Sequence, residues 1–128
     1  MKKISLVIVL FLLVFTSLKC DAKRQYPEKY YQNLWCGTWN GKQEVELFDY
    51  TRVDCITKNY AVEFDFAKKW AECLGQALHY GDVTGKKPAC ILIVENPKDY
   101  ARLYKTKPTF NRHGVMLWYM QAPDYKEN

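Results

Sequence analysis

The strongest constraint on the fold is a six-residue run, ACILIV at residues 89–94, in which every side chain is apolar. A run without alternation is typical of a strand that is buried on both faces in the middle of a sheet. The preceding segment, 67–80, is rich in Ala, Leu, Lys and Glu, which predicts a helix that ends at Gly81. A further strand is expected at 60–66. Strand, helix and strand in succession predict a right-handed crossover between parallel strands, and therefore an α/β fold.

The remaining segments complete a mixed central sheet flanked by helices. Aromatic residues at roughly helical spacing, with Pro27 near their start and Gly41 just past their end, predict the first helix. Lys58-Asn59 predicts a tight turn between two strands, so the centre of the chain is expected to form an antiparallel meander. The predicted elements are, in order, a helix at 26–40, strands at 43–48, 52–57 and 60–66, a helix at 67–80, a strand at 89–94, a short helix from 97 to about 104 and a strand at 114–120.

The first 22 residues have the pattern of an export signal. Two lysines precede an apolar-rich run at 4–18, and the small residues ending at Ala22 are spaced like a signal-peptidase site. We therefore predict a signal peptide at 1–22 and a single exported domain, periplasmic or secreted, at 23–128. The apolar run is shorter than the roughly 20 residues of a membrane span, so no stable membrane insertion is expected after cleavage. Anchoring through an uncleaved N-terminal segment is the alternative.

Cleavage would leave four cysteines, and the even number predicts two disulfides in an oxidising compartment. The spacing leaves all three pairings open among Cys36, Cys55, Cys73 and Cys90. No pair has the CxxC spacing of a zinc ribbon, and the two histidines stand apart, so the sequence does not indicate a Cys/His metal site. The formal net charge of the whole chain, +5, is only a mild attraction for an anionic partner.

Acidic side chains converge in the predicted meander. Asp54 lies in its second strand, while Glu63 and Asp65 are two residues apart in the third and therefore share a face. Acidic residues are disfavoured in strands, and three neighbouring carboxylates repel one another unless a positive charge lies between them. A hard divalent cation, Mg²⁺ or Mn²⁺, would remove that repulsion. The alternative is a solvated sheet face on which these acids pair with nearby lysines and arginines.

The following helix carries a polar row that points the same way. At 100° per residue, Lys69, Gln76 and Tyr80 fall within about 40° of one another, beside the apolar face that is expected to pack on the sheet. Lys69 is therefore expected to reach over the strand face that carries the carboxylates. A solvated helix stripe is the alternative interpretation.

At this point the residues resemble a family. The α-β-β-β-α-β order, with Asp54 on one strand and Glu63 on the next, is similar to the restriction-endonuclease-like core of the PD-(D/E)XK nuclease superfamily. The sequence QALHY at 76–80 matches the QxxxY element of its RecB-type members, and the stretch 51–95 is similar to a group of small bacterial proteins with this fold. The resemblance extends from about Gly41 to Glu95.

The resemblance implies a metal-dependent nuclease that hydrolyses phosphodiester bonds of DNA, with RNA left open. Carried over, Asp54 and Glu63 would bind Mg²⁺ or Mn²⁺, and Glu44 would assist them. The departure is Asp65, which stands where the family has a lysine, and Lys69 is the candidate for a migrated lysine. The implied catalytic residues are Asp54, Glu63, Asp65 and Lys69. The implied substrate-binding residues are Gln76 and Tyr80.

The alternative function is an exported nucleic-acid- or protein-binding module that keeps the nuclease fold without its activity. Aromatic residues of the first helix, such as Tyr30, Trp35 and Trp39, would then form a contact surface. The sequence makes no prediction about the oligomeric state.

Overall fold

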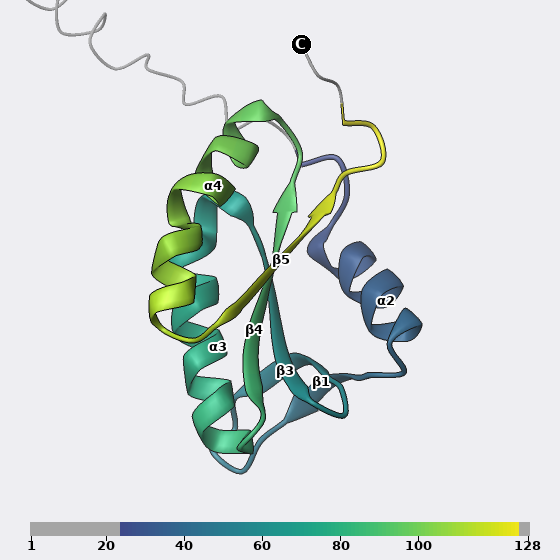
Figure 1. Ribbon diagram of the computed structural model, residues 1–128. Coiled ribbons are helices and arrows are strands. Elements are labelled where there is room, and N and C mark those ends of the chain that lie inside the picture. Colours follow the sequence, from purple (N-terminus) through teal and green to yellow (C-terminus); the bar gives the residue numbers. More distant parts are fainter. Residues whose placement is uncertain (1–23, 126–128) are drawn as a thin grey trace, which may run out of the picture.

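The structure, a computed structural model, describes residues 24–125; the predicted signal peptide and its cleavage site lie outside this range. The chain folds into one sheet with helices on both faces (Figure 1). In chain order the elements are α2 (Glu28–Thr38), β1 (Lys42–Glu46), β2 (Arg52–Ile56), β3 (Tyr60–Phe66), the 3₁₀ turn η1 (Ala67–Lys69), α3 (Trp70–Thr84), β4 (Lys87–Val94), α4 (Pro97–Arg112) and β5 (Met116–Gln121).

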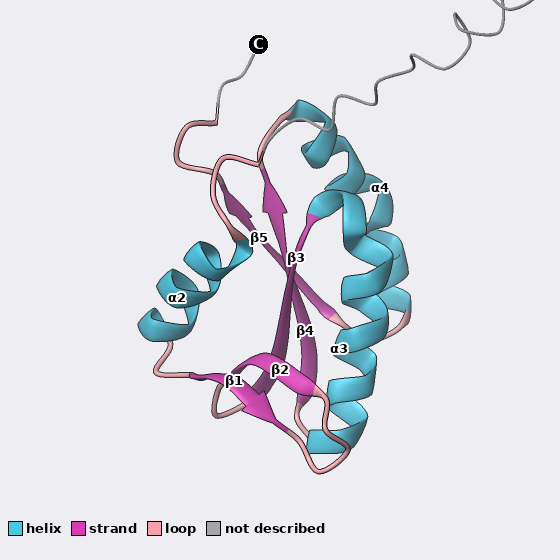
Figure 2. Cartoon of the chain, turned by 180° about the vertical axis from the view of Figure 1, so that it is seen from behind, coloured by secondary structure: helices cyan, strands magenta, loops and turns pink. Residues whose placement is uncertain are grey.

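The sheet is mixed, as the sequence predicts. Its five strands follow one another in the order β1-β2-β3-β4-β5. The first three are antiparallel neighbours, and β3, β4 and β5 run parallel, connected by α3 and α4. Figure 2 shows α3 and α4 on one face of the sheet and α2 on the other. The predicted α/β class, with a mixed sheet flanked by helices, is therefore confirmed.

The predicted end of the second long helix, at Gly81, is wrong. α3 continues through Gly81 to Thr84, and Gly85 ends it with a left-handed backbone, φ 67°. Gly81 has a packing role instead, because a Cβ atom there would lie 3.1 Å from the Pro88 side chain. The predicted start is also different, since residues 67–69 form the separate turn η1.

The predicted short helix ending near Tyr104 is also wrong. α4 extends to Arg112 with Pro108 inside it, and its Asn96 cap accepts a hydrogen bond from the backbone N–H of Asp99 at 3.2 Å. Leu103 and Phe110 are both buried on this helix. Burial of the second half of α4 thus outweighs the cost of an internal proline. The other elements begin and end within a few residues of their predicted bounds.

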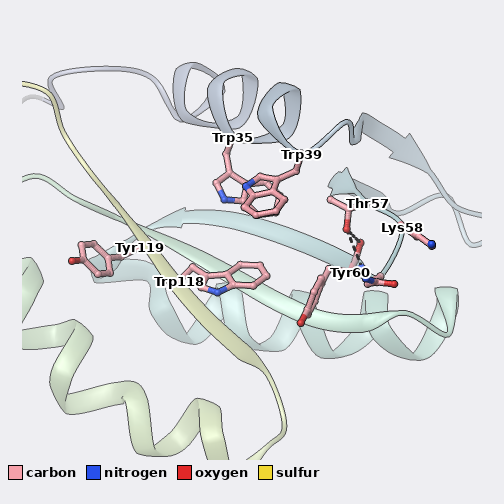
Figure 3. A pocket seen from close by; sticks show the side chains of 8 residues that line it. Trp35, Trp39, Thr57, Lys58, Tyr60, Trp118 and Tyr119 are labelled. Atoms are coloured by element: carbon pink, nitrogen blue, oxygen red, sulfur yellow. Dashed lines mark hydrogen bonds between the residues drawn. The ribbon is translucent and has the colours of Figure 1, made fainter.

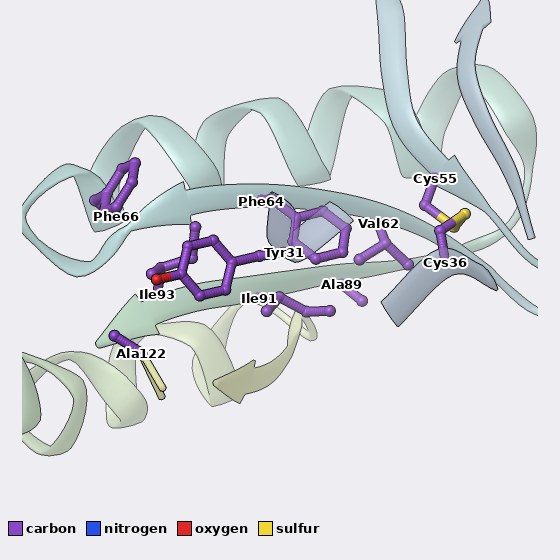
Figure 4. Close-up of a cluster of buried hydrophobic side chains, with 10 residues drawn as sticks. All are labelled: Tyr31, Cys36, Cys55, Val62, Phe64, Phe66, Ala89, Ile91, Ile93 and Ala122. Carbon is purple, nitrogen blue, oxygen red and sulfur yellow. A yellow bond between two sulfur atoms is a disulfide. The ribbon is translucent and has the colours of Figure 1, made fainter. Parts of the chain in front are cut away.

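Each face of the sheet has its own apolar layer. Under α2, Tyr31 packs with Phe64 and Ile91, as Figure 4 shows. Under α3 and α4, a second cluster includes Leu92 and Phe110. Residues 89–94 of β4 are buried throughout, in agreement with the interpretation of the ACILIV run as a central strand.

Two disulfides connect the helices to the sheet. Cys36–Cys55 joins the end of α2 to β2, and Cys73–Cys90 joins α3 to β4, with Cα–Cα distances of 5.9 and 6.0 Å. The predicted two disulfides are confirmed, and the structure selects one of the three possible pairings. Disulfides form and persist in oxidising environments such as the periplasm or the extracellular space. Between residues 24 and 125, the structure contains no helix with the length and apolarity that crossing a membrane requires.

Candidate functional site

The candidate site lies where β2 and β3 separate. The two strands pair at Cys55↔Val62 and Ile56↔Ala61. At Asp54 the carboxylate takes the place of a backbone acceptor, since its Oδ2 accepts a hydrogen bond from the N–H of Phe64 at 2.8 Å. An aspartate is tolerated inside β2 because it provides the acceptor that the separated strand no longer offers.

Glu63 is the buried member of an acidic pair. Its side chain is 6% exposed, and Oε1 accepts a hydrogen bond from the Gln76 amide of α3. Burial, and then the charge of Asp54, raises the pKa of Glu63 to about 9. Burial also raises the pKa of Asp54, to about 6, although the Phe64 N–H opposes this rise. At neutral pH the two carboxyl groups therefore hold a proton that an exposed pair would have released.

Asp65 lies further along the same face of β3. It is 5% exposed, and its Oδ1 accepts a hydrogen bond from the N–H of Phe66 at 2.9 Å. Burial raises the pKa of Asp65 to about 6, the charge of Lys69 lowers it, and the charge of Glu28 raises it again. The charge of Lys69 therefore acts on Asp65. Lys69 belongs to η1 rather than to α3, so the helical-wheel argument that placed it in one row with Gln76 and Tyr80 does not hold.

The Lys69 ammonium group also faces Glu72, an acid in the first turn of α3. Its Nζ lies 3.8 Å from Glu72, and the side chain is 42% exposed. The cation therefore lies between two acids, Asp65 and Glu72, at the solvent-accessible rim of the site. This arrangement holds a positive charge beside Asp65, two residues along β3 from Glu63.

Gln76 and Tyr80, the two ends of the QxxxY element, occupy different environments. Gln76 reaches the sheet through its bond to Glu63. Tyr80 is 7% exposed and packs with Val53 and Ala61. Burial, followed by the negative charge of Glu63, raises the pKa of the Tyr80 phenol to about 12. Tyr80 therefore stays neutral beside the acids and retains a hydroxyl proton.

Glu44 lies at the edge of the acidic region. Its backbone has a left-handed φ of 51°, a conformation that costs a non-glycine residue about 1–2 kcal/mol. The carboxylate forms ion pairs with Lys29 at 3.3 Å and Arg52 at 4.0 Å. Its charge contributes to the raised pKa of Asp54, so the two acids are near one another. Strained backbones are concentrated at functional sites, which makes Glu44 a reasonable member of this one.

The sequence analysis missed Glu28 and Gln32, which bring α2 into the site. Gln32 is 3% exposed and donates a hydrogen bond to Glu28 Oε1 at 3.0 Å. Burial, and then the charge of Asp54, raises the pKa of Glu28. The available signal was the spacing of these two polar residues, four apart, in a helix whose other buried positions are Tyr31 and Cys36.

A hard divalent cation requires several oxygen ligands, some of which can be water. Between residues 24 and 125, no three or more His, Cys, Asp and Glu side chains are grouped so that they could hold a metal ion. The predicted set of Glu44, Asp54 and Glu63 is therefore not preassembled. However, Glu63 Oε2 is buried and receives no hydrogen bond. An oxygen of this kind next to a second carboxyl group is satisfied either by a shared proton or by a cation, and Mg²⁺ commonly uses only one or two carboxylates plus water.

Fold and site together define a disulfide-linked α/β domain with a buried acidic site at the opening of its sheet. No family model, curated protein or solved structure matches the chain.

Proposed function

We propose that this domain is a metal-dependent nuclease with a restriction-endonuclease-like core, as the resemblance to PD-(D/E)XK proteins implies. The observation that carries the proposal is the Asp54–Glu63 carboxyl pair, which is buried so that Glu63 Oε2 has no donor other than a proton shared with Asp54. A buried pair of this kind needs either a shared proton or a cation to offset its charge, and we propose that a cation takes this place during catalysis. Two neighbours extend the site: the charge of Lys69 acts on Asp65, and Glu28 at the start of α2 is close enough to Asp54 to feel its charge.

Each residue of the site has a role that follows from its surroundings. Asp54 and Glu63 would hold Mg²⁺ or Mn²⁺, assisted by Glu44. A cation held there supplies a water of lowered pKa and polarises a phosphodiester oxygen. The Gln76 amide fixes the orientation of the Glu63 carboxyl. Asp65 keeps the Lys69 ammonium at the rim, where it can face a phosphate.

Tyr80 and Gln76 are the proposed contacts to the nucleic-acid backbone. The neutral phenol of Tyr80 can donate a hydrogen bond without adding negative charge to an already acidic site. Backbone contacts of this kind position a strand without reading its sequence. The expected substrate is DNA, with RNA as the second possibility, and the proposed location is outside the cytoplasm.

Cleavage of single-stranded DNA, double-stranded DNA and RNA by the domain at 23–128 tests the proposal. The assay contains Mg²⁺ or Mn²⁺, and EDTA stops the reaction in a parallel sample. Asp54→Asn and Glu63→Gln keep the size of each side chain and should each lower the rate by at least about a hundredfold. The matched control is Glu46→Gln, which removes an exposed carboxylate of β1 that pairs with Arg52. Equal cleavage by the wild type and both site variants would contradict the proposal.

A binding module on an inactive nuclease fold is the second candidate. Part of the aromatic surface expected for it exists, since Trp39 is 61% exposed and Trp35 lies beside it at a centroid distance of 5.8 Å. Tyr31, in contrast, is a core residue. Absence of cleavage, together with absence of any metal-induced stabilisation, would favour this candidate.

A further inference from the structure

A groove, separate from the acidic site, lies on the face of the sheet opposite α3 and α4. One helix, α2, covers this face (Figure 2). It leaves an open groove of about 470 Å³ between itself and β5. In Figure 3, Trp35 and Trp39 extend from α2 toward Trp118 of β5 and Tyr60 of β3. None of the residues that line the groove belongs to the acidic site. The volume lies within the range of small-molecule sites.

The walls of the groove are aromatic rings that hold one another in place. Trp35 and Trp118 are tilted by 33° with their centroids 5.5 Å apart, and Tyr60 meets Trp118 edge-on at 5.0 Å. These ring contacts hold Trp35, Trp118 and Tyr60 in place in the absence of a ligand. Trp39, by contrast, is 61% exposed beside Trp35. Its indole therefore offers a flat surface on which a planar ring gains area by stacking.

The turn between β2 and β3 forms one end of the groove and is itself held rigidly. The backbone N–H of Tyr60 donates to Thr57 Oγ1 at 3.1 Å. The carbonyl groups of Lys58 and Asn59 accept hydrogen bonds from the Lys86 ammonium at 2.8 Å and from the Lys87 N–H at 3.0 Å. The turn is therefore a preorganised rim.

The charge of this rim is positive. Within residues 24–125, the Lys58 ammonium forms no ion pair, and the groove has no acidic lining residue. An aromatic floor with one unpaired cation beside it fits a planar ring that carries an anionic group. It disfavours a cationic ligand, and an uncharged sugar would leave the ammonium unused.

We propose that this groove binds a nucleotide, with its base stacked on Trp39 and its phosphate beside Lys58. Single-stranded nucleic acids are bound in this manner, by aromatic platforms that accept any base and cations that follow the phosphates. The preference for a flat anion follows from the groove alone. The choice of a nucleotide among such anions rests on the proposed nuclease function.

Tryptophan fluorescence of the domain at 23–128, titrated in EDTA, tests the inference without cleavage. The probes are AMP, adenosine, which lacks the phosphate, and ribose 5-phosphate, which lacks the base. AMP should quench the fluorescence saturably and bind at least about tenfold more tightly than either fragment. A short oligoadenylate separates the two sources of the ligand: equal affinity per site supports a free nucleotide, and tighter binding supports a strand. Absence of saturable AMP binding, or equal binding of AMP and adenosine, would overturn the proposal.

Two exposed side chains provide variants that leave the core intact. Trp39→Ala should weaken AMP about tenfold or more, and Lys58→Ala should weaken AMP while leaving adenosine unchanged. Because Trp39 also contributes fluorescence, the Trp39→Ala affinity is measured by calorimetry. The matched control is Tyr104→Ala. Tyr104 is 73% exposed and lies in α4, on the opposite face of the sheet. Unchanged AMP affinity in both groove variants would overturn the site.

Failure of this inference and failure of the nuclease proposal are distinguishable. Metal-dependent cleavage without AMP binding in the groove would overturn the nucleotide-binding inference and support the nuclease proposal. If the protein does not cleave nucleic acid but binds AMP, and Trp39→Ala and Lys58→Ala weaken this binding, the nucleotide site is supported and the nuclease proposal is overturned.

Discussion

The Glu63 carboxyl is buried beside a second acid, Asp54, and its pKa of about 9 reflects the cost of ionising it there. The ordinary value is 4.5, so the folded protein retains this proton at a pH where the unfolded chain has lost it. The stabilisation that the proton provides is complete below pH 4.5 and is lost as the pH rises toward 9. Glu63 therefore acts against stability in alkaline solution unless a cation replaces the proton.

This reasoning predicts the effect of Glu63→Gln. In EDTA, the variant should show a flatter dependence of unfolding free energy on pH between 4.5 and 9 than the wild type. At pH 8 it should be more stable by about 1–3 kcal/mol, since the amide does not have to take up a proton when the chain folds. Urea unfolding at a series of pH values measures this. Glu46→Gln, at an exposed position, should follow the wild-type curve, and an equally steep curve for Glu63→Gln would contradict the prediction.

Lys69 and its neighbour Lys68 provide a second comparison between single residues. Lys69 acts on the pKa of Asp65, whereas Lys68 lines a separate hollow with Arg24 and Glu95. If the nuclease proposal holds, Lys69→Ala should lower kcat by about 10²–10³, the usual effect of removing a group that stabilises transition-state charge. Lys68→Ala should retain most of the activity. Single-turnover cleavage measures both, and equal rates for the two variants would remove Lys69 from the site.

Among the secondary-structure elements, the junction between α2 and β1 depends on one close approach. The N–H of Gly41 donates to the Cys36 carbonyl at 2.9 Å, and a Cβ atom at Gly41 would overlap both sulfur atoms of the Cys36–Cys55 disulfide. Glycine is required here by space rather than by backbone conformation, because the sulfur atoms occupy the volume of a side chain.

We therefore predict opposite effects for two Gly→Ala substitutions. Gly41→Ala should destabilise the domain by about 1–3 kcal/mol, as overpacking does in other interiors. Gly37→Ala, in α2 with no atom within 4 Å of its new Cβ, should be neutral or stabilise by up to about 1 kcal/mol. Thermal unfolding of the oxidised proteins compares them. An unchanged melting temperature for Gly41→Ala would contradict the described contact.

The same elements show what the sequence can and cannot predict. The strand at 60–66 has the predicted bounds because its period-two pattern and its turn agree. The end of α3 differs from its predicted position, because the role of Gly81 depends on its packing against Pro88 of the following strand, which the helical pattern does not reveal. The positions of Asp54 and Glu63 on neighbouring strands could be predicted, because alternation along a strand decides which side chains share a face. Glu28 was missed because the face of α2 that meets the sheet depends on tertiary packing.

In the whole molecule, the two faces of the sheet are covered to different extents. Two long helices, each followed by a parallel strand, cover one face, and the shorter α2 covers part of the other (Figure 2). The disulfides connect one helix on each face to the sheet. The acidic site lies where the sheet opens between β2 and β3, and the aromatic groove lies where α2 ends. A stable scaffold thus carries two open regions of opposite chemical character.

A cation bound at the acidic site should stabilise the whole domain. A ligand that binds only the folded state at a hundredfold excess over its Kd adds about 2.7 kcal/mol, and each kcal/mol raises the melting temperature of a domain of about 100 residues by roughly 4–8 °C. Mg²⁺ or Mn²⁺ should therefore raise the wild-type melting temperature measurably, and EDTA should reverse the shift.

If the proposed cation binds there, the size of that shift should depend on pH, because the cation and the proton would compete for the same two carboxyl groups. It should be larger at pH 8 than at pH 6, since less of the proton held by Asp54 and Glu63 remains to be displaced. Asp54→Asn should abolish the shift, whereas Glu46→Gln should retain it. Calorimetry at the two pH values measures the effect, and a shift of equal size in Asp54→Asn would place the cation elsewhere on the molecule.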